Sequence, residues 1–325
     1  MKILITGGAG FLGARLAREL LHRGQLDGKP IEEMVLADLY PPAADLVADA
    51  RVRAATGALI AQCIGWRSEP FDTVFHLAAA VSAECEANFD LGMRSNLDST
   101  RALLDALRGA GNVPRLVFAS SLAVYGSDPG LPLPAVIRHD TLPAPQSSYG
   151  VQKFICEQLV ADCTRKGFVD GRNVRLMTVV VRPGAPNGAA SGFLSSIIRE
   201  PANGKPAVCP VPLDMKVALA SPARTVAGLL AAAEAPREAM GGRIAVNMPG
   251  LTVTVGEMLD ALETAAGKEA RGLVRFEPDE QITRIVGGWP AIFDNTRALR
   301  LGLEPDPDFL SIVRAYLHER APAIG

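Results

Sequence analysis

A chain of 325 residues, 48% of them hydrophobic, is long enough to bury a sizeable core in one large domain or two modest ones. The formal net charge is −2 at pH 7, with acidic and basic residues interspersed along the chain. This balance excludes the basic surface that binds nucleic acids or anionic membranes. We therefore expect a small-molecule partner, and neither a nucleic acid nor a membrane.

The five cysteines indicate the compartment in which the protein works. Their number is odd and no pair has C-x-x-C spacing, which argues against a disulfide framework and against a zinc site. Residues 1–5 lead directly into a glycine-rich turn and leave no room for a signal peptide, and no apolar stretch approaches the roughly 18 residues that span a bilayer. We expect a cytoplasmic protein that binds no metal.

Short runs of Val, Ile and Leu alternate with helical patterns through the first half of the chain. The helical patterns carry leucines three or four residues apart and end at glycines such as Gly24 and Gly109. This alternation predicts βα units on a doubly wound parallel sheet, an α/β fold. The predicted strands are residues 2–6, 34–38, 73–76, 116–119 and 174–181.

A glycine-rich turn follows the first predicted strand and opens the first predicted helix. Gly7 permits the tight turn, Gly10 lets the backbone approach a pyrophosphate, and Gly13 permits close packing of helix against strand. The start of the helix then offers free N–H donors to phosphates. Glycine spacing alone can mark a merely structural turn, but strand, turn and helix in this order predict a Rossmann dinucleotide-binding domain.

Asp38 ends the second predicted strand, where a carboxylate can accept both hydroxyls of an adenosine ribose. The same charge repels a 2′-phosphate, so we expect NAD rather than NADP as the cofactor. The spacing from Gly13 is longer than usual, and an insertion over residues 25–33 explains the difference. An exposed aspartate at a strand end is the structural alternative.

Tyr149 and Lys153 place a phenol and an ammonium four residues apart on one face of a predicted helix. A cation near the phenol lowers its pKa from about 10 towards neutrality, as a general base requires. Such pairs are common on helices and by themselves carry no function. Upstream, however, Ser120 and Ser121 end a predicted strand, at the edge where α/β sheets bind ligands. His76, inside another strand, is expected to be a core histidine.

After Pro183 the strict alternation weakens, although residues 243–247 still have the pattern of a strand. Thr254 and Glu257 predict a capping box that opens a helix. The proline-rich stretches 127–146 and 200–213 are too long for simple connectors and are typical of functional loops. We expect an NAD-binding domain over residues 1–181, with a return of the chain around 217–248, and a smaller substrate-binding part over 182–216 and 249–325.

Five segments together resemble a known family. They are residues 7–13, 75–79, 96–100, 121–126 and 140–149, and they span most of residues 1–185. In this order they resemble the extended short-chain dehydrogenases/reductases, also called the NAD-dependent epimerase/dehydratase family. The resemblance implies an enzyme in which Ser121 hydrogen-bonds the reacting oxygen, Tyr149 moves its proton, and Lys153 holds the nicotinamide ribose.

The resemblance also implies a cofactor site and a homodimer. Helices over residues 90–107 and 149–165 would pair across the dimer, and ordinary intramolecular core is the alternative for their apolar faces. Asn96 would anchor the structure around the cofactor. The implied NAD-binding residues are Gly7, Gly10, Phe11, Leu12, Asp38, Leu77, Ala78, Ala79, Asn96, Tyr149, Lys153 and Pro183.

Two departures from the family pattern limit the activity. Many relatives bind the adenine amine with an acidic residue after the third strand, where this chain has only Thr, Gly, Ala and Leu over residues 56–59. Sugar-nucleotide dehydratases carry an acidic pair just after the catalytic hydroxyl, where this chain has Leu122 and Ala123. Neither side chain can help to eliminate water, so dehydratase activity is disfavoured.

The segments around residues 181–193, 198–201, 208–212 and 287–290 are unlike those of nucleotide-sugar enzymes. They resemble a branch of the family that oxidises a four-carbon sugar acid, D-erythronate, at C2 with NAD. Ser82, Asn187 and Ser191 would then contact substrate, together with Ser121 and Tyr149. The carboxylate needs a cation, for which the candidates are Arg182, Arg199 and Arg224, each of which could equally be a surface or structural arginine.

Two other functions stay open at this point. A nucleotide-sugar 4-epimerase would keep NAD bound and return the hydride to the opposite face of the sugar. A non-catalytic dinucleotide sensor would have no use for the Tyr149 and Lys153 pair.

Overall fold

The structure is a computed structural model that describes residues 1–184 and 191–320. Its centre is a seven-stranded sheet in the order β12-β8-β7-β6-β1-β4-β5, in which every neighbouring pair is parallel. Its strands are β1 (Lys2–Thr6), β4 (Glu33–Asp38), β5 (Val52–Thr56), β6 (Thr73–His76), β7 (Arg115–Ser121), β8 (Asp170–Leu176) and β12 (Val246–Asn247). The predicted α/β fold with a doubly wound parallel sheet is confirmed.

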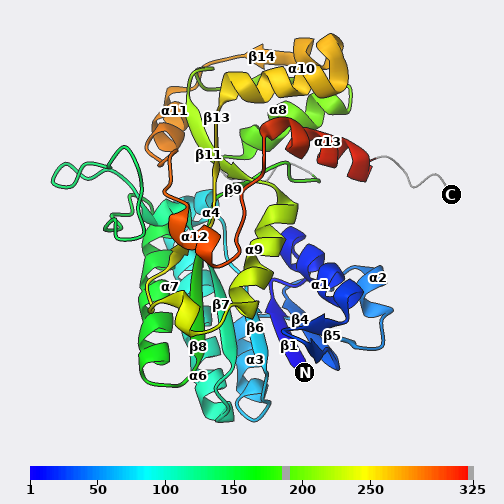
Figure 1. Ribbon diagram of the computed structural model, residues 1–325, viewed down its shortest axis with the longest axis vertical. Helices are drawn as coiled ribbons and strands as arrows, with labels where there is room; N and C mark the ends of the chain where they lie inside the picture. The colour runs from blue at the N-terminus through cyan, green and yellow to red at the C-terminus, as the bar shows by residue number, and fades with distance from the viewer. Residues whose placement is uncertain (185–190, 321–325) are drawn as a thin grey trace.

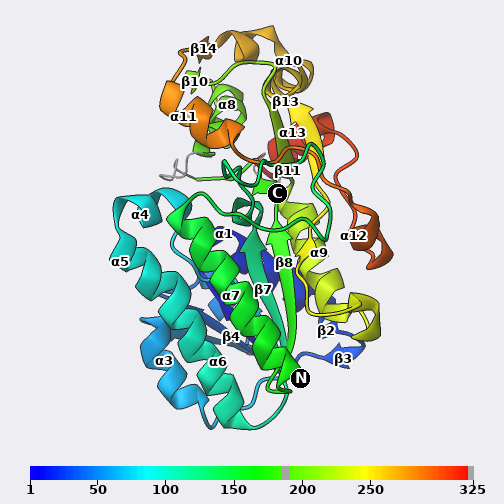
Figure 2. The ribbon, with the colours of Figure 1, turned by 90° about the vertical axis from the view of Figure 1, so that its left-hand side faces the viewer.

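Helices cover both faces of this sheet (Figures 1 and 2). Along β1, Ile3 and Ile5 pack in the core on one face while Leu4 packs in the core on the other, because side chains alternate along a strand. The first core includes α1 (Phe11–Arg23) and α9 (Pro222–Glu234), and the second includes α3 (Leu59–Trp66), α6 (Ser99–Ala110) and α7 (Ser148–Arg165). Burial on both faces explains why β1 and β4 are almost continuously apolar.

A second, smaller part lies beyond the carboxyl edge of the large sheet, at the top of Figure 1. Its own apolar core is separate from those of the large sheet. It contains a three-stranded sheet of β9 (Thr178–Val179), β11 (Lys216–Ala220) and β13 (Leu251–Thr254), and a pair of β10 (Ala207–Cys209) with β14 (Val274–Phe276). Its helices are α8 (Gly192–Ala202), α10 (Val255–Gly272), α11 (Glu280–Gly287) and α13 (Phe309–Arg320).

Two local expectations have different outcomes. The capping box is confirmed, since Thr254 Oγ1 accepts from the Glu257 N–H at 3.1 Å and the Glu257 carboxylate accepts from the Thr254 N–H at 2.6 Å. The single strand expected over residues 174–181 is wrong. The chain leaves the large sheet after β8 and pairs again as β9 with β11, so one apolar run serves two sheets.

The remaining elements are short. The insertion over residues 25–33 contains the hairpin β2 (Gln25–Leu26) and β3 (Lys29–Pro30). The large sheet is rejoined by α9 and β12, whereas β11 stays in the smaller part. The other helical segments are α2 (Ala44–Val47), α4 (Ser82–Ala87), α5 (Phe89–Gly92), the π-helix η1 (Met93–Asp98), the 3-10 turns η2 (Leu122–Val124) and η3 (Glu238–Met240), and α12 (Thr296–Arg300).

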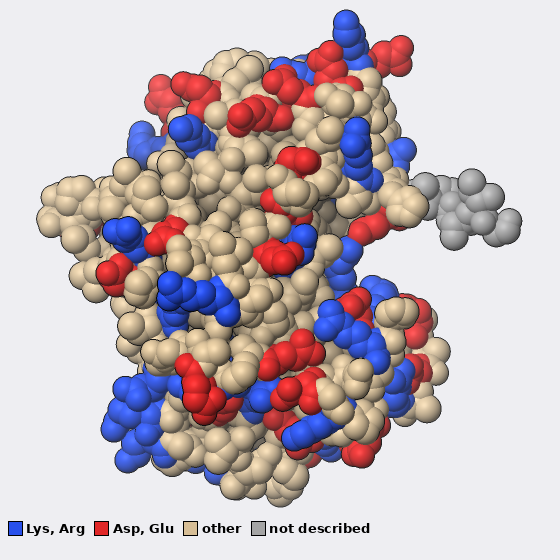
Figure 3. All heavy atoms as spheres, in the orientation of Figure 1, with Lys and Arg blue, Asp and Glu red and all other residues tan. Residues whose placement is uncertain are grey.

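On the face drawn in Figure 3, acidic and basic side chains are intermingled over both parts of the molecule. Within the described residues, no helix is both long and apolar enough to cross a membrane.

Candidate active site

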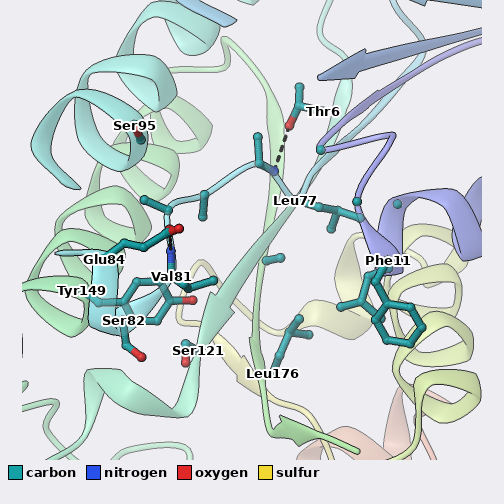
Figure 4. Close-up of a pocket in the computed structure, with 18 of the residues that line it drawn as sticks. Thr6, Phe11, Leu77, Val81, Ser82, Glu84, Ser95, Ser121, Tyr149 and Leu176 are labelled. Carbon is teal, nitrogen blue, oxygen red and sulfur yellow. Dashed lines mark hydrogen bonds between the residues drawn. The ribbon is translucent and has the colours of Figure 1, made fainter. Parts of the chain in front are cut away.

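A cleft of about 910 Å³ runs along the carboxyl edge of the large sheet and under the smaller part. It is lined by the turn after β1, the ends of β4, β6 and β7, and the start of α7, together with residues from the smaller part. Figure 4 shows the part of this cleft around Tyr149. This edge of an open α/β sheet is where ligands bind.

The turn after β1 requires glycine. Gly7 has φ +73°, and a Cβ there would lie 2.8 Å from the Ala78 nitrogen. A Cβ on Gly13 would lie 2.0 Å from the Gly7 carbonyl oxygen, so only glycine lets α1 start this close to the turn. Gly10 is the N-cap of α1, whose first turn carries no acidic side chain. The free N–H groups there can therefore receive a pyrophosphate.

Asp38 ends β4 and lines the cleft beside this turn. Its carboxylate accepts from the backbone N–H of Ala9 at 3.0 Å and of Tyr40 at 3.4 Å, which fixes its direction. No lysine or arginine within the described parts of the chain forms an ion pair with it. The carboxylate is therefore free to accept the hydroxyls of a ribose and to repel a 2′-phosphate.

The adenine end of the cleft carries no acidic residue after β5, as the sequence of residues 56–59 indicated. Its wall after β5 is formed by Gly57, Ala58, Leu59 and Ile60, none of which carries a charge. An adenine ring can be held there by apolar contact and by backbone groups.

A chain of hydrogen bonds fixes the loop that follows β6. Thr6 Oγ1 accepts from the Ala78 N–H at 3.3 Å and contacts His76 Nδ1 at 2.6 Å, while His76 Nε2 contacts Thr100 Oγ1 at 2.8 Å. Thr100 donates in turn to the Asn96 carbonyl at 2.6 Å. Burial lowers the pKa of His76 to about 3, so the ring is neutral. The expected core histidine is confirmed.

Leu77, Ala78 and Ala79 line the cleft on this loop, but Asn96 does not. Asn96 is buried in η1, where its side chain accepts from the Ala80 N–H at 2.8 Å and donates to the Ala80 carbonyl at 3.3 Å and to Gln152 at 2.8 Å. It therefore holds the loop and joins it to α7. Of the two roles implied for Asn96, anchoring matches its contacts, and direct cofactor contact does not.

Tyr149, Ser121 and Ser82 lie close together in the cleft (Figure 4). Ser121 ends β7, and Tyr149 is in the first turn of α7, whose N-cap Ser147 accepts from the Gly150 N–H at 3.1 Å. A Cβ on Gly150 would lie 2.1 Å from the Ala123 carbonyl oxygen, so glycine after Tyr149 lets α7 begin directly against η2. This contact brings the phenol to the end of β7.

Burial raises the pKa of Tyr149 to about 12, and its hydrogen bond with the Ser121 side chain and the charge of Arg182 offset part of that rise. Lys153 is buried, with Nζ 5.8 Å from the centre of the Tyr149 ring, and donates to the Ala119 carbonyl at 2.8 Å. Burial lowers the pKa of Lys153 to about 8. The charge of Arg182 therefore lowers the Tyr149 pKa in this structure. The same effect expected from Lys153 stays a prediction.

A buried polar network behind Lys153 was not predicted from the sequence. Glu157, one turn after Lys153, accepts from Ser120 Oγ at 2.5 Å and from Arg175 at 2.6 and 2.8 Å. Arg175 also donates to the Tyr125 hydroxyl at 2.5 Å. These contacts tie α7 to β7 and β8, and so fix Lys153 relative to the strand end. No spacing in the sequence indicates this network, because Ser120, Glu157 and Arg175 come from three elements.

The three candidate arginines have different environments. Arg182 lines the cleft, its Nε donates to the Val179 carbonyl at 3.3 Å, and no carboxylate among the described residues forms an ion pair with it. Arg199 also lines the cleft but pairs with Glu200 at 2.8 Å and donates to the Arg182 carbonyl at 2.9 Å. Arg224 pairs with Glu304 at 2.8 Å and does not line the cleft.

Most of the other site residues named from the sequence line the cleft. Gly7, Gly10, Phe11, Leu12, Ser82, Pro183 and Ser191 all line the cleft. Asn187 lies outside the described residues. Met177, Thr178 and Trp289 line the same cleft, although no sequence pattern marked them as site residues. Within residues 1–184 and 191–320, no three His, Cys, Asp or Glu side chains are grouped to hold a metal ion.

The sheet order, the glycine turn at the start of α1 and the carboxylate at the end of β4 define a Rossmann-type dinucleotide-binding protein. Residues 3–246 match the description "NAD dependent epimerase/dehydratase family". The chain belongs to this family, as its motifs predicted. It is an NAD-dependent enzyme of the extended short-chain dehydrogenase/reductase type.

Similar proteins extend the match to the whole chain. A D-erythronate dehydrogenase from Cupriavidus necator is 49% identical over 325 residues, which is 98% of both chains. One from Haemophilus influenzae is 41% identical over 324 residues, 98% of this chain and 99% of its own. A crystal structure described as a nucleoside-diphosphate-sugar epimerase from Agrobacterium tumefaciens has a TM-score of 0.90 and 42% identity, and covers 98% of this chain and 94% of its own.

Proposed function

We propose that the chain oxidises D-erythronate, or a sugar acid of the same size, at C2 with NAD. One structural observation carries the proposal: the hydroxyls of Ser121 and Tyr149 and the guanidinium of Arg182, which pairs with no carboxylate of residues 1–184 and 191–320, line one cleft next to a dinucleotide turn. This combination suits a hydroxy acid, which presents a reacting hydroxyl beside a carboxylate. Whole-length similarity to two proteins named D-erythronate dehydrogenase supports the same substrate.

The residues fit NAD, which when bound supplies the hydride acceptor. In this proposal the N–H groups of Phe11 and Leu12 receive the pyrophosphate, Gly10 lets the backbone approach it, and Gly7 allows the turn. Asp38 accepts the adenosine ribose hydroxyls. Leu77, Ala78, Ala79 and Pro183 form the walls around the cofactor, and Asn96 acts indirectly by holding the loop at Ala80.

The phenolate of Tyr149 takes the proton of the C2 hydroxyl while the C2–H bond breaks and its electron pair leaves as hydride. The products are a 2-oxo acid, NADH and, once Tyr149 returns to solvent equilibrium, one proton. Ser121 holds the reacting oxygen against Tyr149, and Lys153 holds the nicotinamide ribose. Because burial opposes the phenolate, positive charge near Tyr149 is required, and Arg182 contributes to it.

Arg182 also binds the substrate carboxylate in this proposal. It is the candidate arginine that lines the cleft without a carboxylate partner among the described residues, and burial lowers its pKa, which an anionic ligand would reverse. Ser82 and Ser191 line the cleft and can bind the remaining hydroxyls. Asn187 stays a candidate for the same role.

The decisive experiment is incubation of the purified protein with D-erythronate and excess free NAD, followed by absorbance of NADH. We expect NADH in large stoichiometric excess over enzyme. One similar structure is described as a nucleoside-diphosphate-sugar epimerase. A nucleotide-sugar 4-epimerase would instead interconvert UDP-sugars with no net NADH. That result would reject the proposal. A dinucleotide sensor would bind NAD and show neither activity.

We also propose a homodimer formed through α6 and α7. On α7, Val151 and Ile155 lie four residues apart and expose 42% and 38% of their surface, so two exposed apolar side chains share one face of the helix. Light scattering of the purified protein should give twice the mass of the 34.3 kDa chain. Charged residues at both positions should give the monomer mass.

The division of labour within the chain follows from the same proposal. Residues 1–181, with the return around 217–248, carry the NAD site, except that β9 and β11 pair in the sheet of the smaller part. Residues 182–216 and 249–325 cover the substrate. The five cysteines carry free thiols, which suits a cytoplasmic enzyme. Fractionation of cells that produce the protein tests this location.

A further inference from the structure

Trp289 brings a large side chain into the cleft from a distant part of the sequence. Trp289 is half-buried and follows α11. Among the described residues that line the cleft, it alone lies beyond residue 199 in the sequence. All other described lining residues belong to residues 6–199. The cofactor half of the cleft is therefore complete without it.

The packing of Trp289 places it at the substrate end. It packs against the apolar cluster that contains Leu122 and Met177, both of which line the cleft. Leu122 directly follows Ser121 at the end of β7, so the cluster that Trp289 packs against adjoins the end of the strand that carries Ser121. It also packs against the core of the smaller part and thereby bridges the two parts of the molecule.

The backbone on both sides of Trp289 is held in place. The Trp289 N–H donates to the Val286 carbonyl at 3.1 Å, and Thr252 Oγ1 donates to the Ala291 carbonyl at 2.6 Å. Further on, the Ile137 N–H donates to the Ile292 carbonyl at 2.9 Å. Because these contacts lie within three residues on either side, the indole is a fixed wall of the cleft.

We propose that Trp289 sets the length limit of the substrate, so that a four-carbon acid fits and longer sugar acids do not. This inference rests on the proposed function. With the carboxylate held by Arg182 and C2 held at Tyr149, a longer chain must extend away from both groups, and the indole closes that direction. A fixed apolar wall discriminates by about 10- to 200-fold for each misfit group of methylene size.

The test compares kcat/KM for four-, five- and six-carbon aldonates in the wild type and in Trp289→Ala. We expect the wild type to favour the four-carbon acid over the six-carbon acid at least about tenfold, and Trp289→Ala to reduce that ratio at least about tenfold, chiefly through KM for the longer acid. Trp289→Phe should fall between them. A ratio that is unchanged in Trp289→Ala would overturn the inference.

Ile285→Ala provides the matched control, because Ile285 lies on α11 but is exposed and does not line the cleft. It should leave the length ratio at its wild-type value. If Ile285→Ala changes the ratio as strongly as Trp289→Ala, the effect comes from a disturbed α11 and the inference is rejected.

Fluorescence separates a failure of this inference from a failure of the proposed function. Trp66, the other tryptophan, is the last residue of α3 and is buried in the core. Trp66→Phe therefore leaves Trp289 as the single source of tryptophan fluorescence. With NAD present, the four-carbon acid should change the emission and the six-carbon acid should not, whether or not NADH forms. If neither acid changes the emission, or if both acids change it equally, Trp289 sets no length limit.

Discussion

The cofactor half of the cleft and its substrate half are built in different ways. On the cofactor side, Gly7, Gly13 and Asp38 lie within one βαβ unit, and each has a backbone or charge requirement that the local sequence satisfies. On the substrate side, Arg182, Ser191 and Trp289 come from separate segments that meet only after folding. Short-range sequence therefore specifies the cofactor, and long-range packing specifies the substrate.

This difference explains how one cofactor site can serve several chemistries. The hydrogen-bonded chain from Ala78 through His76 to Asn96 fixes the cofactor loop from inside the large sheet, independently of the smaller part. The substrate wall depends on α8, α11 and the segment around Trp289, which pack in their own core. Changes in that core can alter the substrate without disturbing NAD binding.

Tyr149→Phe gives the sharpest separation of the two halves. Loss of the phenolic oxygen should lower kcat for D-erythronate oxidation by about 10²- to 10⁴-fold, the usual contribution of a general base. The dissociation constant for NAD, measured by calorimetry, should stay within a few-fold of the wild type. In the wild type, kcat/KM should rise with pH from 7 to 9, because burial raises the pKa of Tyr149. Turnover intact in the variant would exclude Tyr149 as the general base.

Lys153→Met tests how far burial lowers the pKa of the lysine on α7. Burial lowers the folded-state pKa of Lys153 to about 8, below the unfolded value of 10.5. Between these values the unfolded chain binds more protons, so this residue's contribution makes the free energy of unfolding rise with pH from about 8 to 10.5. Relative to the variant, the wild type should gain on the order of 3 kcal/mol over that range.

The measurement for Lys153 is urea unfolding of both proteins at pH 7 and pH 10.5. Other titrating groups cancel in the difference between the two proteins. A difference independent of pH would show that Lys153 has an ordinary pKa in the folded chain.

The same division governs what the sequence could predict. The parallel sheet, the glycine turn, Asp38, the neutral core His76 and the capping box at Thr254 were foreseen, because each follows from neighbouring residues. The break between β8 and β9 was missed because an apolar run does not show which sheet each residue joins.

The pair Glu157 and Arg175 was missed because α7 and β8 must pack together to form it. Likewise, the sequence offered three arginines for a carboxylate without a means of choosing. The structure shows that Arg199 and Arg224 already have acidic partners.

Arg182→Met addresses the substrate half. If Arg182 binds the carboxylate, its loss should raise KM for D-erythronate by about 10- to 100-fold, the value of a hydrogen bond to a charged group. The dissociation constant for NAD should not change. Arg224→Met is the matched control, because Arg224 pairs with Glu304 outside the cleft, and its kinetics should equal those of the wild type. Equal KM in the two variants would exclude Arg182 as the carboxylate ligand.

Asp38→Asn addresses the cofactor half with the smallest expected effect. Asparagine keeps an oxygen that can accept from the Ala9 N–H, so the turn should survive, but the ribose loses a charged acceptor. Replacing a charged by a neutral hydrogen bond costs about 1 kcal/mol, so the dissociation constant for NAD should rise about fivefold. Affinity for NADP should increase, because the negative charge that repels a 2′-phosphate is gone.

Calorimetry with both cofactors measures the Asp38 effect, and Asp45→Asn is the control, since Asp45 is exposed and pairs with Arg18 outside the cleft. The ratio of the NAD and NADP dissociation constants should move in Asp38→Asn alone. The length preference among sugar acids should stay at the wild-type value, because the hydrogen-bond donors to Asp38 in the described parts of the chain are Ala9 and Tyr40, both on the cofactor side. A change in that preference would show that the two halves of the cleft are coupled.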